Sequence, residues 1–293
     1  MKFKFDLYSG RPNPIWQLSP KAGNVVFELI NDSGLLGVLP RTPFPARLGY
    51  RGLKIELTPD IVRKYNVSPW INLSVDLGID QNLLFNELAA IAWMSDFLGL
   101  GGYFEMLQKI LKQFQKSGGS GGAKGGGSGG SGGKKPAQTY GPCSFEMLPY
   151  DPAPWNDPAF KPTNNCYAYA SGQRKAYRQK PQPGEGSGAM FTDVTGADVA
   201  AAAKRDGAHD VGDCFPDTEA PRHLVALVIW PGEDYHWYRK HPDCWGHKPG
   251  STTARNVDNS GTIIANPQTC DRGDYTEFMG YMLLPKSLKI AST

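Results

Sequence analysis

Residues 223–248 read HLVALVIWPGEDYHWYRKHPDCWGHK, and this stretch determines the fold expected for the second half of the chain. The run from His223 to Trp230 is apolar throughout, which is typical of a buried central strand. A Pro-Gly dipeptide ends the run. The aromatic segments 234–240 and 244–248 then flank a short polar loop, a pattern that indicates a β-hairpin. The stretch therefore predicts an antiparallel sheet.

The register of this hairpin brings two histidines together. If the turn centres between His241 and Pro242, His236 lies directly opposite His247. Directly opposite side chains have Cβ atoms about 5 Å apart, so the two imidazoles would share one face of the sheet. One ring would then be placed to act as a base while the other orients it.

A helix is predicted over residues 167–178, directly after Asn164-Asn165-Cys166. Either asparagine is a good N-cap, and Cys166 then lies in the first turn. The unpaired N–H groups and the helix dipole favour a thiolate there, which is how a nucleophilic cysteine is activated. The alternative is a small buried side chain, the commoner fate of a cysteine.

Three further elements complete the second half. A helix is expected from its cap, Thr195, to Arg205, with Gly207 as the stop. Strands are expected over residues 262–265 and 276–284.

The order of these elements resembles that of the papain-like hydrolases, a superfamily that includes cell-wall amidases. The resemblance covers about residues 160–285 and lies in the order and type of the elements. In that superfamily a cysteine opens a helix, a histidine follows on an antiparallel strand, and a third polar residue lies on the next strand. The resemblance implies an α+β papain-like fold with Cys166 as the nucleophile, His236 as the base and His247 as the orienting residue. Tyr167 stands where the superfamily often has tryptophan.

Other polar residues compete for two of these roles. His223 is the rival base, in which case His236 takes the third place. Asn256 or Asp258 is an alternative orienting residue, although such Asn/Asp clusters more often only form a turn.

A zinc site is the alternative to the triad. The hairpin contains His236, His241, Cys244 and His247, which are zinc ligands by type and closely spaced. Binding all four to one ion would require a bent loop rather than a hairpin, and it would leave Cys166 without a role. No cofactor is expected if the triad is correct.

A glycine-rich segment divides the chain into two bodies. Residues 117–133 read SGGSGGAKGGGSGGSGG, contain no apolar group to bury and predict a flexible linker. The composition is typical of an engineered linker, with a natural spacer as the alternative. We call residues 1–116 the N-terminal body and residues 134–293 the C-terminal body. A short tether of this kind holds a partner at about millimolar effective concentration.

The N-terminal body is predicted to be a small α+β domain. Alternation over residues 2–8 and the run 53–57 predict strands, and Thr58-Pro59 begins a helix that ends at Tyr65. Further helices are expected over residues 24–31 and within 80–115. This body has no cysteine or histidine, so a binding or scaffolding role is expected. Arg11 and Trp16, beside the Gly-Arg-Pro-Asn-Pro turn, are candidate contacts, with an ordinary surface loop as the alternative.

Composition excludes several classes of protein. The chain has 293 residues, is 40% apolar and carries a formal charge of only +3, which argues against disorder and against nucleic-acid binding. No run approaches the roughly 20 apolar residues of a membrane span, and no signal peptide is visible.

The cysteine count bears on the compartment. The sequence has five cysteines, so at least one thiol is free. Five thiols in a reducing compartment are expected, with a secreted form carrying two bridges as the alternative. We therefore expect a cytoplasmic protein, or one exported without a classical signal peptide.

Taken together, the residues predict a cysteine-dependent hydrolase or acyltransferase. It would act on a peptide, amide or ester through a covalent acyl-enzyme, with the N-terminal body as its partner. The alternatives are a zinc-binding protein, a non-catalytic interaction protein, or a toxin-like hydrolase fused to its inhibitor. In the last case the N-terminal body would cover Cys166.

Overall fold

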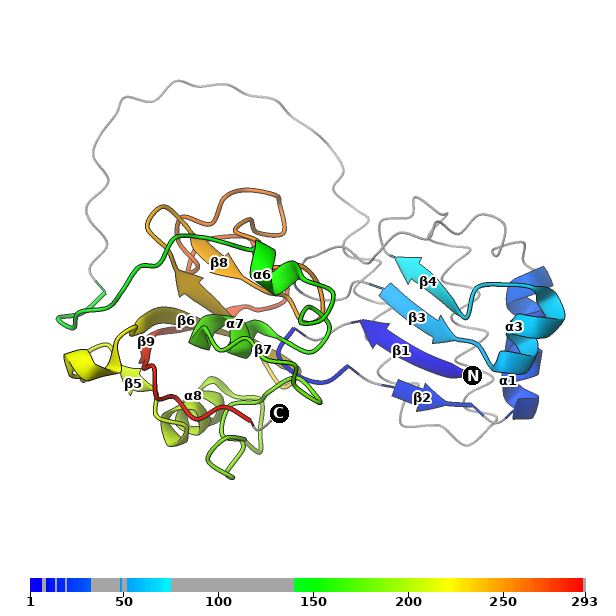
Figure 1. Cartoon of the computed structure of the whole chain (residues 1–293), viewed down its shortest axis with the longest axis horizontal. Helices are drawn as coiled ribbons and strands as arrows, with labels where there is room; N and C mark the ends of the chain where they lie inside the picture. The colour runs from blue at the N-terminus through cyan, green and yellow to red at the C-terminus, as the bar shows by residue number, and fades with distance from the viewer. Residues whose placement is uncertain are drawn as a thin grey trace, which may run out of the picture.

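A computed structural model describes residues 1–6, 9–13, 15–18, 20–32, 48, 52–74 and 140–291. The linker and the helical pattern expected within residues 80–115 lie outside these ranges. The described residues form helices and two antiparallel sheets, so the predicted α+β class is confirmed (Figure 1).

The first sheet lies in the N-terminal body and has the strand order β2-β1-β3-β4. The side chains of Phe3 and Ile55, which face one another across β1 and β3, are buried, as the alternation predicts. The strands are β1 (Lys2–Asp6), β2 (Ile15–Gln17), β3 (Gly52–Glu56) and β4 (Trp70–Ser74).

Two helices accompany this sheet. Helix α3 (Pro59–Tyr65) has the predicted bounds, with Pro59 at its first position and Asn66 ending it in a left-handed conformation. Helix α1 (Pro20–Asp32) is longer than predicted. The rings of Phe27 and Tyr65 lie 4.7 Å apart, which packs the two helices together.

The second sheet lies in the C-terminal body and has the order β5-β9-β6-β7-β8. Its central strand has the predicted bounds because the apolar run and the Pro-Gly break are strong local signals. Residues 262–265 form no strand, and the prediction there is wrong: Ile263 makes only an isolated bridge to Val257. The strands are β5 (His209–Asp210), β6 (His223–Trp230), β7 (Asp234–Lys240), β8 (Trp245–His247) and β9 (Glu277–Leu284).

The helices of the C-terminal body are short. Helix α8 (Gly196–Arg205) begins as predicted, with the Thr195 side chain accepting a hydrogen bond from Asp198. Helix α7 (Cys166–Ser171) ends far earlier than predicted because Gly172 adopts a left-handed conformation, φ 72°. The remaining helices are α6 (Ala153–Asn156) and a short 3₁₀ turn, η1 (Asp217–Glu219).

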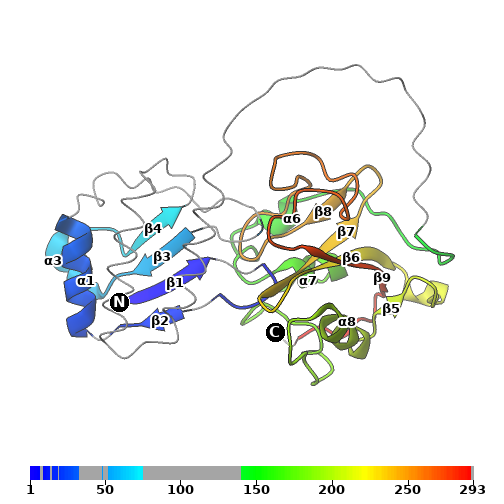
Figure 2. The same cartoon turned by 180° about the vertical axis from the view of Figure 1, so that it is seen from behind.

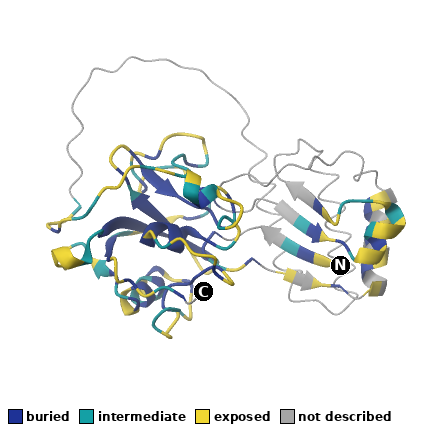
Figure 3. Cartoon of the chain, viewed as in Figure 1, coloured by how far each residue is buried: buried dark blue, intermediate teal, exposed yellow. Residues whose placement is uncertain are grey.

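The two faces of the second sheet carry separate apolar clusters. Tyr235 and Trp237 of β7 pack on one face with Cys166 of α7. Tyr238, the next residue of the strand, packs on the other face with Trp245 and Tyr275. Figure 3 shows these strands mostly in dark blue, the colour of buried residues.

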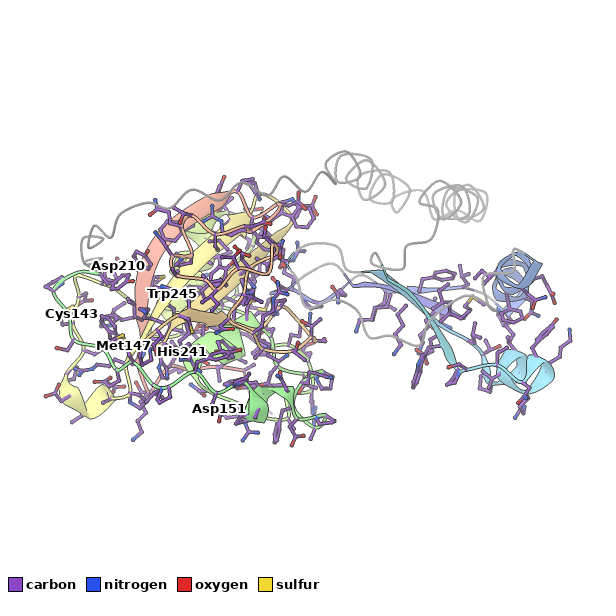
Figure 4. All side chains as sticks on the ribbon, turned by 90° about the horizontal axis from the view of Figure 1, so that it is seen from above. Cys143, Met147, Asp151, Asp210, His241 and Trp245 are labelled. Atoms are coloured by element: carbon purple, nitrogen blue, oxygen red, sulfur yellow. A yellow bond between two sulfur atoms is a disulfide. The ribbon has the colours of Figure 1, made fainter. Side chains whose placement is uncertain are left out.

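One disulfide bond corrects the expectation of five thiols. Cys143 and Cys214, 71 positions apart, are bonded, whereas Cys166, Cys244 and Cys270 are free (Figure 4 labels Cys143). The bond closes a long loop, and no sequence spacing identifies such a pair. Within the described ranges, no helix has the length and apolar character needed to cross a bilayer.

Candidate functional site

The predicted histidine pair exists, although the predicted register is wrong by two residues. Tyr238, not His236, lies opposite His247. The turn is longer than expected because the His241 N–H donates to the Cys244 carbonyl and closes a four-residue loop. A shift of two positions keeps every side chain on the same face. His236 Nε2 therefore still lies 2.9 Å from His247 Nδ1.

The outer nitrogen of His247 has two neighbours of opposite character. His247 Nε2 lies 3.0 Å from the Val257 carbonyl, which only accepts, and 3.3 Å from Arg255 Nε, which only donates. Burial, and then the nearby Arg255 guanidinium, lower the pKa of His247 to about 3, so the ring is neutral at pH 7. The two neighbours match opposite tautomers of this ring, and the direction of the bond between the two histidines follows the tautomer.

The other nitrogen of His236 meets a residue of the N-terminal body. Ser9 Oγ lies 2.9 Å from His236 Nδ1, although the two residues are 227 positions apart. The serine is completely buried. Its hydroxyl also lies 2.9 Å from the Tyr275 hydroxyl, and 3.1 and 3.3 Å from two acceptors, Asp234 Oδ2 and the Tyr235 carbonyl.

The backbone around Ser9 is held by one carboxylate. The Ser9 and Gly10 amides donate to Asp234 Oδ2 at 2.6 and 3.1 Å, and the Arg11 amide donates to Oδ1 at 3.0 Å. Two hydroxyls also lie within hydrogen-bond distance of Oδ2, that of Ser9 at 3.1 Å and that of Tyr275 at 2.5 Å. Asp234 is fully buried, so these bonds are shielded from water.

Gly10 fits closely between two sets of contacts. Its carbonyl accepts from the side-chain amides of Asn165, at 2.7 Å, and Gln182, at 3.0 Å. A Cβ placed on Gly10 would lie 2.6 Å from two ring carbons of Tyr235 and from its carbonyl oxygen. The N-cap prediction for Asn165 is confirmed, since its Oδ1 accepts from the Ala168 amide. The hydrogen bond from its side-chain amide to the Gly10 carbonyl was not predicted.

The segment Ser9–Arg11 occupies an open edge of the sheet. Strand β8 pairs with residues 238–240 of β7, and within the described ranges no strand pairs with residues 234–236 on that side. Figures 1 and 2 show the chain between β1 and β2, in blue, reaching toward β7. We call residues 9–11 the docked segment, and the residues that bind it the docking site.

Outer contacts extend the docking site. Arg11, a predicted contact residue, donates through its guanidinium to the Glu233 carbonyl, and its own carbonyl accepts from Lys180. The side chain of Trp16, the other predicted contact, lies outside the described part of the structure. A second anchor is Leu48, whose amide donates to Asn259 Oδ1 at 2.9 Å and whose side chain is buried in the Tyr238 cluster.

The structure does not place Cys166 beside the histidine pair, where a nucleophile would have to lie relative to its base. Cys166 is completely buried and its Sγ lies 4.0 Å from the Tyr235 carbonyl. Its apolar cluster lies on the opposite face of the sheet from the cluster of Tyr238, the residue against which the His236 ring packs. Burial raises the pKa of the Cys166 thiol well above its ordinary value, which contradicts the expected activation at the helix start.

We therefore expect Cys166 to resist alkylation in the native protein. At pH 7.5, limiting iodoacetamide should leave Cys166 unlabelled and label Cys270 slowly, because Cys270 is partly exposed although its pKa is raised to about 11. The measurement is peptide mass spectrometry, with the urea-unfolded protein as the control in which all three free thiols react. Preferential labelling of Cys166 that disappears in His236→Ala would contradict this and support the predicted triad.

Two of the three alternative triad residues, Asn256 and Asp258, make contacts of a structural kind. His223 is buried, and burial lowers its pKa to about 3. Asp258 accepts from the amides of Ser260 and Thr262, so it forms a turn, as its alternative interpretation predicts. Asn256 donates to Cys244 Sγ at 3.7 Å. None of these contacts places a side chain beside Cys166.

The zinc prediction is wrong in geometry. His241 Nε2 lies 2.9 Å from the Tyr169 hydroxyl and Nδ1 lies 2.8 Å from the Leu148 carbonyl, so its ring faces away from the histidine pair. Figure 4 shows His241 beside the segment that carries Met147. Among the described residues, which include all four proposed ligands, no cluster of three or more His, Cys, Asp or Glu residues is arranged to hold a metal ion.

The buried histidines make the C-terminal body sensitive to acid. Burial lowers the pKa of His223 and His247 to about 3 and that of His241 to about 4. The unfolded chain, with an ordinary histidine pKa near 6.5, binds these protons earlier than the folded chain does. Stability is therefore expected to fall as the pH drops below about 6.5, by up to about 1.4 kcal/mol per pH unit for each histidine.

Urea unfolding followed by tryptophan fluorescence at pH 7.5, 6.0 and 5.0 measures this slope. Replacing His241 by glutamine should reduce the slope by about a third, since one of the three groups is removed. A free energy of unfolding that stays constant over this range would contradict the expectation.

The sequence prediction missed most of the docking site. Ser9, Asp234, Gln182 and Tyr275 were not singled out, and Gly10 was noted only as part of a turn. One signal was present: an aspartate begins a strand that is otherwise aromatic and basic. Nothing in the sequence connects that aspartate to residue 9.

The fold and the site thus define an α+β protein with a buried docking site for a bent backbone segment. The chain is 42% identical over 135 residues to insoluble matrix shell protein 1 of Ruditapes philippinarum, a match that covers 45% of this chain and 87% of that protein. The chain belongs to the family of this shell protein. No family model and no solved structure matches the chain.

Proposed function

We propose that the C-terminal body is a recognition domain and that the chain is a non-catalytic interaction protein. Its function is to bind the docked segment of the N-terminal body. The observation that carries this proposal is the buried Asp234 carboxylate, which accepts the three successive amides of Ser9, Gly10 and Arg11. A carboxylate only accepts hydrogen bonds. Three successive N–H donors are a feature of peptide backbone, so this carboxylate is matched to a backbone segment.

Binding accounts for the site better than hydrolysis does. The two amides on the Gly10 carbonyl are the kind of donors that stabilise an oxyanion, but the sulfur of Cys166 faces the Tyr235 carbonyl instead. The order of α7 followed by antiparallel strands is compatible with the papain-like resemblance. The cysteine hydrolase stays a prediction. Because burial raises the pKa of the Cys166 thiol, the thiolate that such a hydrolase needs is disfavoured.

The similarity to the shell protein also supports a binding function. It is named as an insoluble matrix shell protein, and an insoluble matrix requires durable contacts between protein segments. The Cys143–Cys214 bond further supports a protein exported to an oxidising compartment.

A cut in the linker tests the proposal directly. Lys124 lies within the glycine-rich run, so brief digestion with a lysine-specific protease separates the two bodies covalently. After the protease is inhibited, size-exclusion chromatography at micromolar protein should give one peak that contains both fragments. Two separate peaks would contradict a recognition domain for this segment.

The same experiment addresses the toxin-like alternative. The C-terminal fragment, separated by mild urea and refolded, is assayed against a fluorogenic peptide library before and after the N-terminal fragment is added back. We expect no hydrolysis in either case. Cleavage that the N-terminal fragment suppresses would favour an enzyme held with its inhibitor.

A further inference from the structure

We propose that the docking site is a sequence-selective receptor for Ser-Gly-Arg segments supplied by other protein chains. This inference rests on the proposed function, since it names the class of partner that the same site accepts. It follows from which contacts of the docked segment involve side chains and which involve backbone.

The serine is selected by its hydroxyl group. The Ser9 hydroxyl lies within hydrogen-bond distance of four buried polar groups: His236 Nδ1, the Tyr275 hydroxyl, the Asp234 carboxylate and the Tyr235 carbonyl. Alanine at this position would remove the hydroxyl from this cluster. The loss of buried hydrogen bonds of this kind weakens binding by about 10- to 100-fold.

The glycine is selected by lack of space. Any Cβ at position 10 would contact the Tyr235 ring and carbonyl at 2.6 Å, and a backbone carbonyl cannot move aside as a flexible side chain can. The Tyr235 ring is itself fixed, since its hydroxyl donates to Gln182. Every residue other than glycine is therefore disfavoured.

The third position selects for a long basic side chain. The Arg11 guanidinium meets the Glu233 carbonyl at the edge of the site, while its backbone amide binds Asp234. Pro12, which follows, is exposed, whereas Asn13 is buried. The ligand class is therefore a bent segment that contains Ser-Gly-Arg, and a segment on another chain presents the same groups as the segment seen here.

Competition by a synthetic peptide tests the inference. The peptide Tyr-Ser-Gly-Arg-Pro-Asn-Pro, the sequence of residues 8–14, is added to the chain cut at Lys124, and the fraction of joined fragments is measured by size-exclusion chromatography. The peptide should separate the fragments. Versions with Ser→Ala or Gly→Ala should require about 10- to 100-fold higher concentrations.

The His236→Ala chain provides a readout that a merely structural effect would not give. In that chain one of the four partners of the serine hydroxyl is absent, so the difference between the Ser and Ala peptides should shrink while the Gly→Ala peptide stays weak. Equal competition by all peptides against the unchanged protein would overturn the inference.

The outcomes separate the two claims. If the cut fragments stay joined but no peptide separates them at millimolar concentration, the inference fails and the proposed function stands, with Leu48 and other contacts holding the fragments. If the cut fragments do not associate at all, the proposed function itself fails.

Discussion

Replacing Gly10 by alanine is expected to separate the two bodies once the linker is cut at Lys124. The added methyl group would lie 2.6 Å from the ring and the carbonyl oxygen of Tyr235, well inside the closest approach of real carbon atoms. Overpacking of this kind costs about 1–3 kcal/mol. The dissociation constant of the cut fragments, measured by fluorescence anisotropy, should therefore rise about 10- to 100-fold.

Gly212→Ala is the matched control for this variant. A Cβ at Gly212 meets no atom within 4 Å, so the same chemical change is made in open space. The Gly212→Ala fragments should associate like the unchanged protein. If Gly10→Ala did so too, the docked segment would not be what holds the bodies together.

Removing the Asp234 carboxylate should have an even larger effect. Asp234→Ala leaves the Ser9, Gly10 and Arg11 amides without their acceptor, and each charge-assisted bond contributes about 1.5–3 kcal/mol. Association of the cut fragments should weaken at least about 100-fold. Asp234→Asn should weaken association less than Asp234→Ala does. Its side-chain amide keeps one oxygen as an acceptor, but its NH₂ group faces backbone N–H donors.

The fold must be checked because Asp234 begins β7 and is buried. Circular dichroism of the uncut variant chains should be unchanged. Asp243→Ala, in the exposed hairpin loop, is the matched control and should leave association intact. Binding that stays within about threefold in Asp234→Ala would show that backbone recognition at this carboxylate is not the main source of affinity.

Local sequence signals predicted the bounds of several helices and strands correctly. Where such signals were absent, the predicted bounds were wrong. Strands β6 and β7 and helix α3 have the predicted bounds because an apolar run, a Pro-Gly break and a Thr-Pro cap act on neighbouring residues. Helix α7 was predicted too long because Gly172 can take either helical or left-handed geometry, and its packing decides which.

The site was predictable only where two strands are joined by a short turn. His236 and His247 are 11 positions apart, so the hairpin pattern alone brought them together despite the register error. The contact between Ser9 and Asp234 spans 225 positions, and the disulfide spans 71. Contacts at such distances depend on how whole elements pack, which no local pattern in one sequence reveals.

The docked segment is presented by a closed loop, and this has a consequence for its affinity. Strands β1 and β2 pair on either side of the loop that contains it, with Lys4 opposite Ile15, so both ends of the loop are fixed when the N-terminal body folds. Part of its loss of conformational entropy is thus incurred on folding rather than on association. A linear peptide of the same sequence must lose that freedom while it binds, whereas a cyclic peptide that reproduces the spacing of the two strand ends would already have lost it.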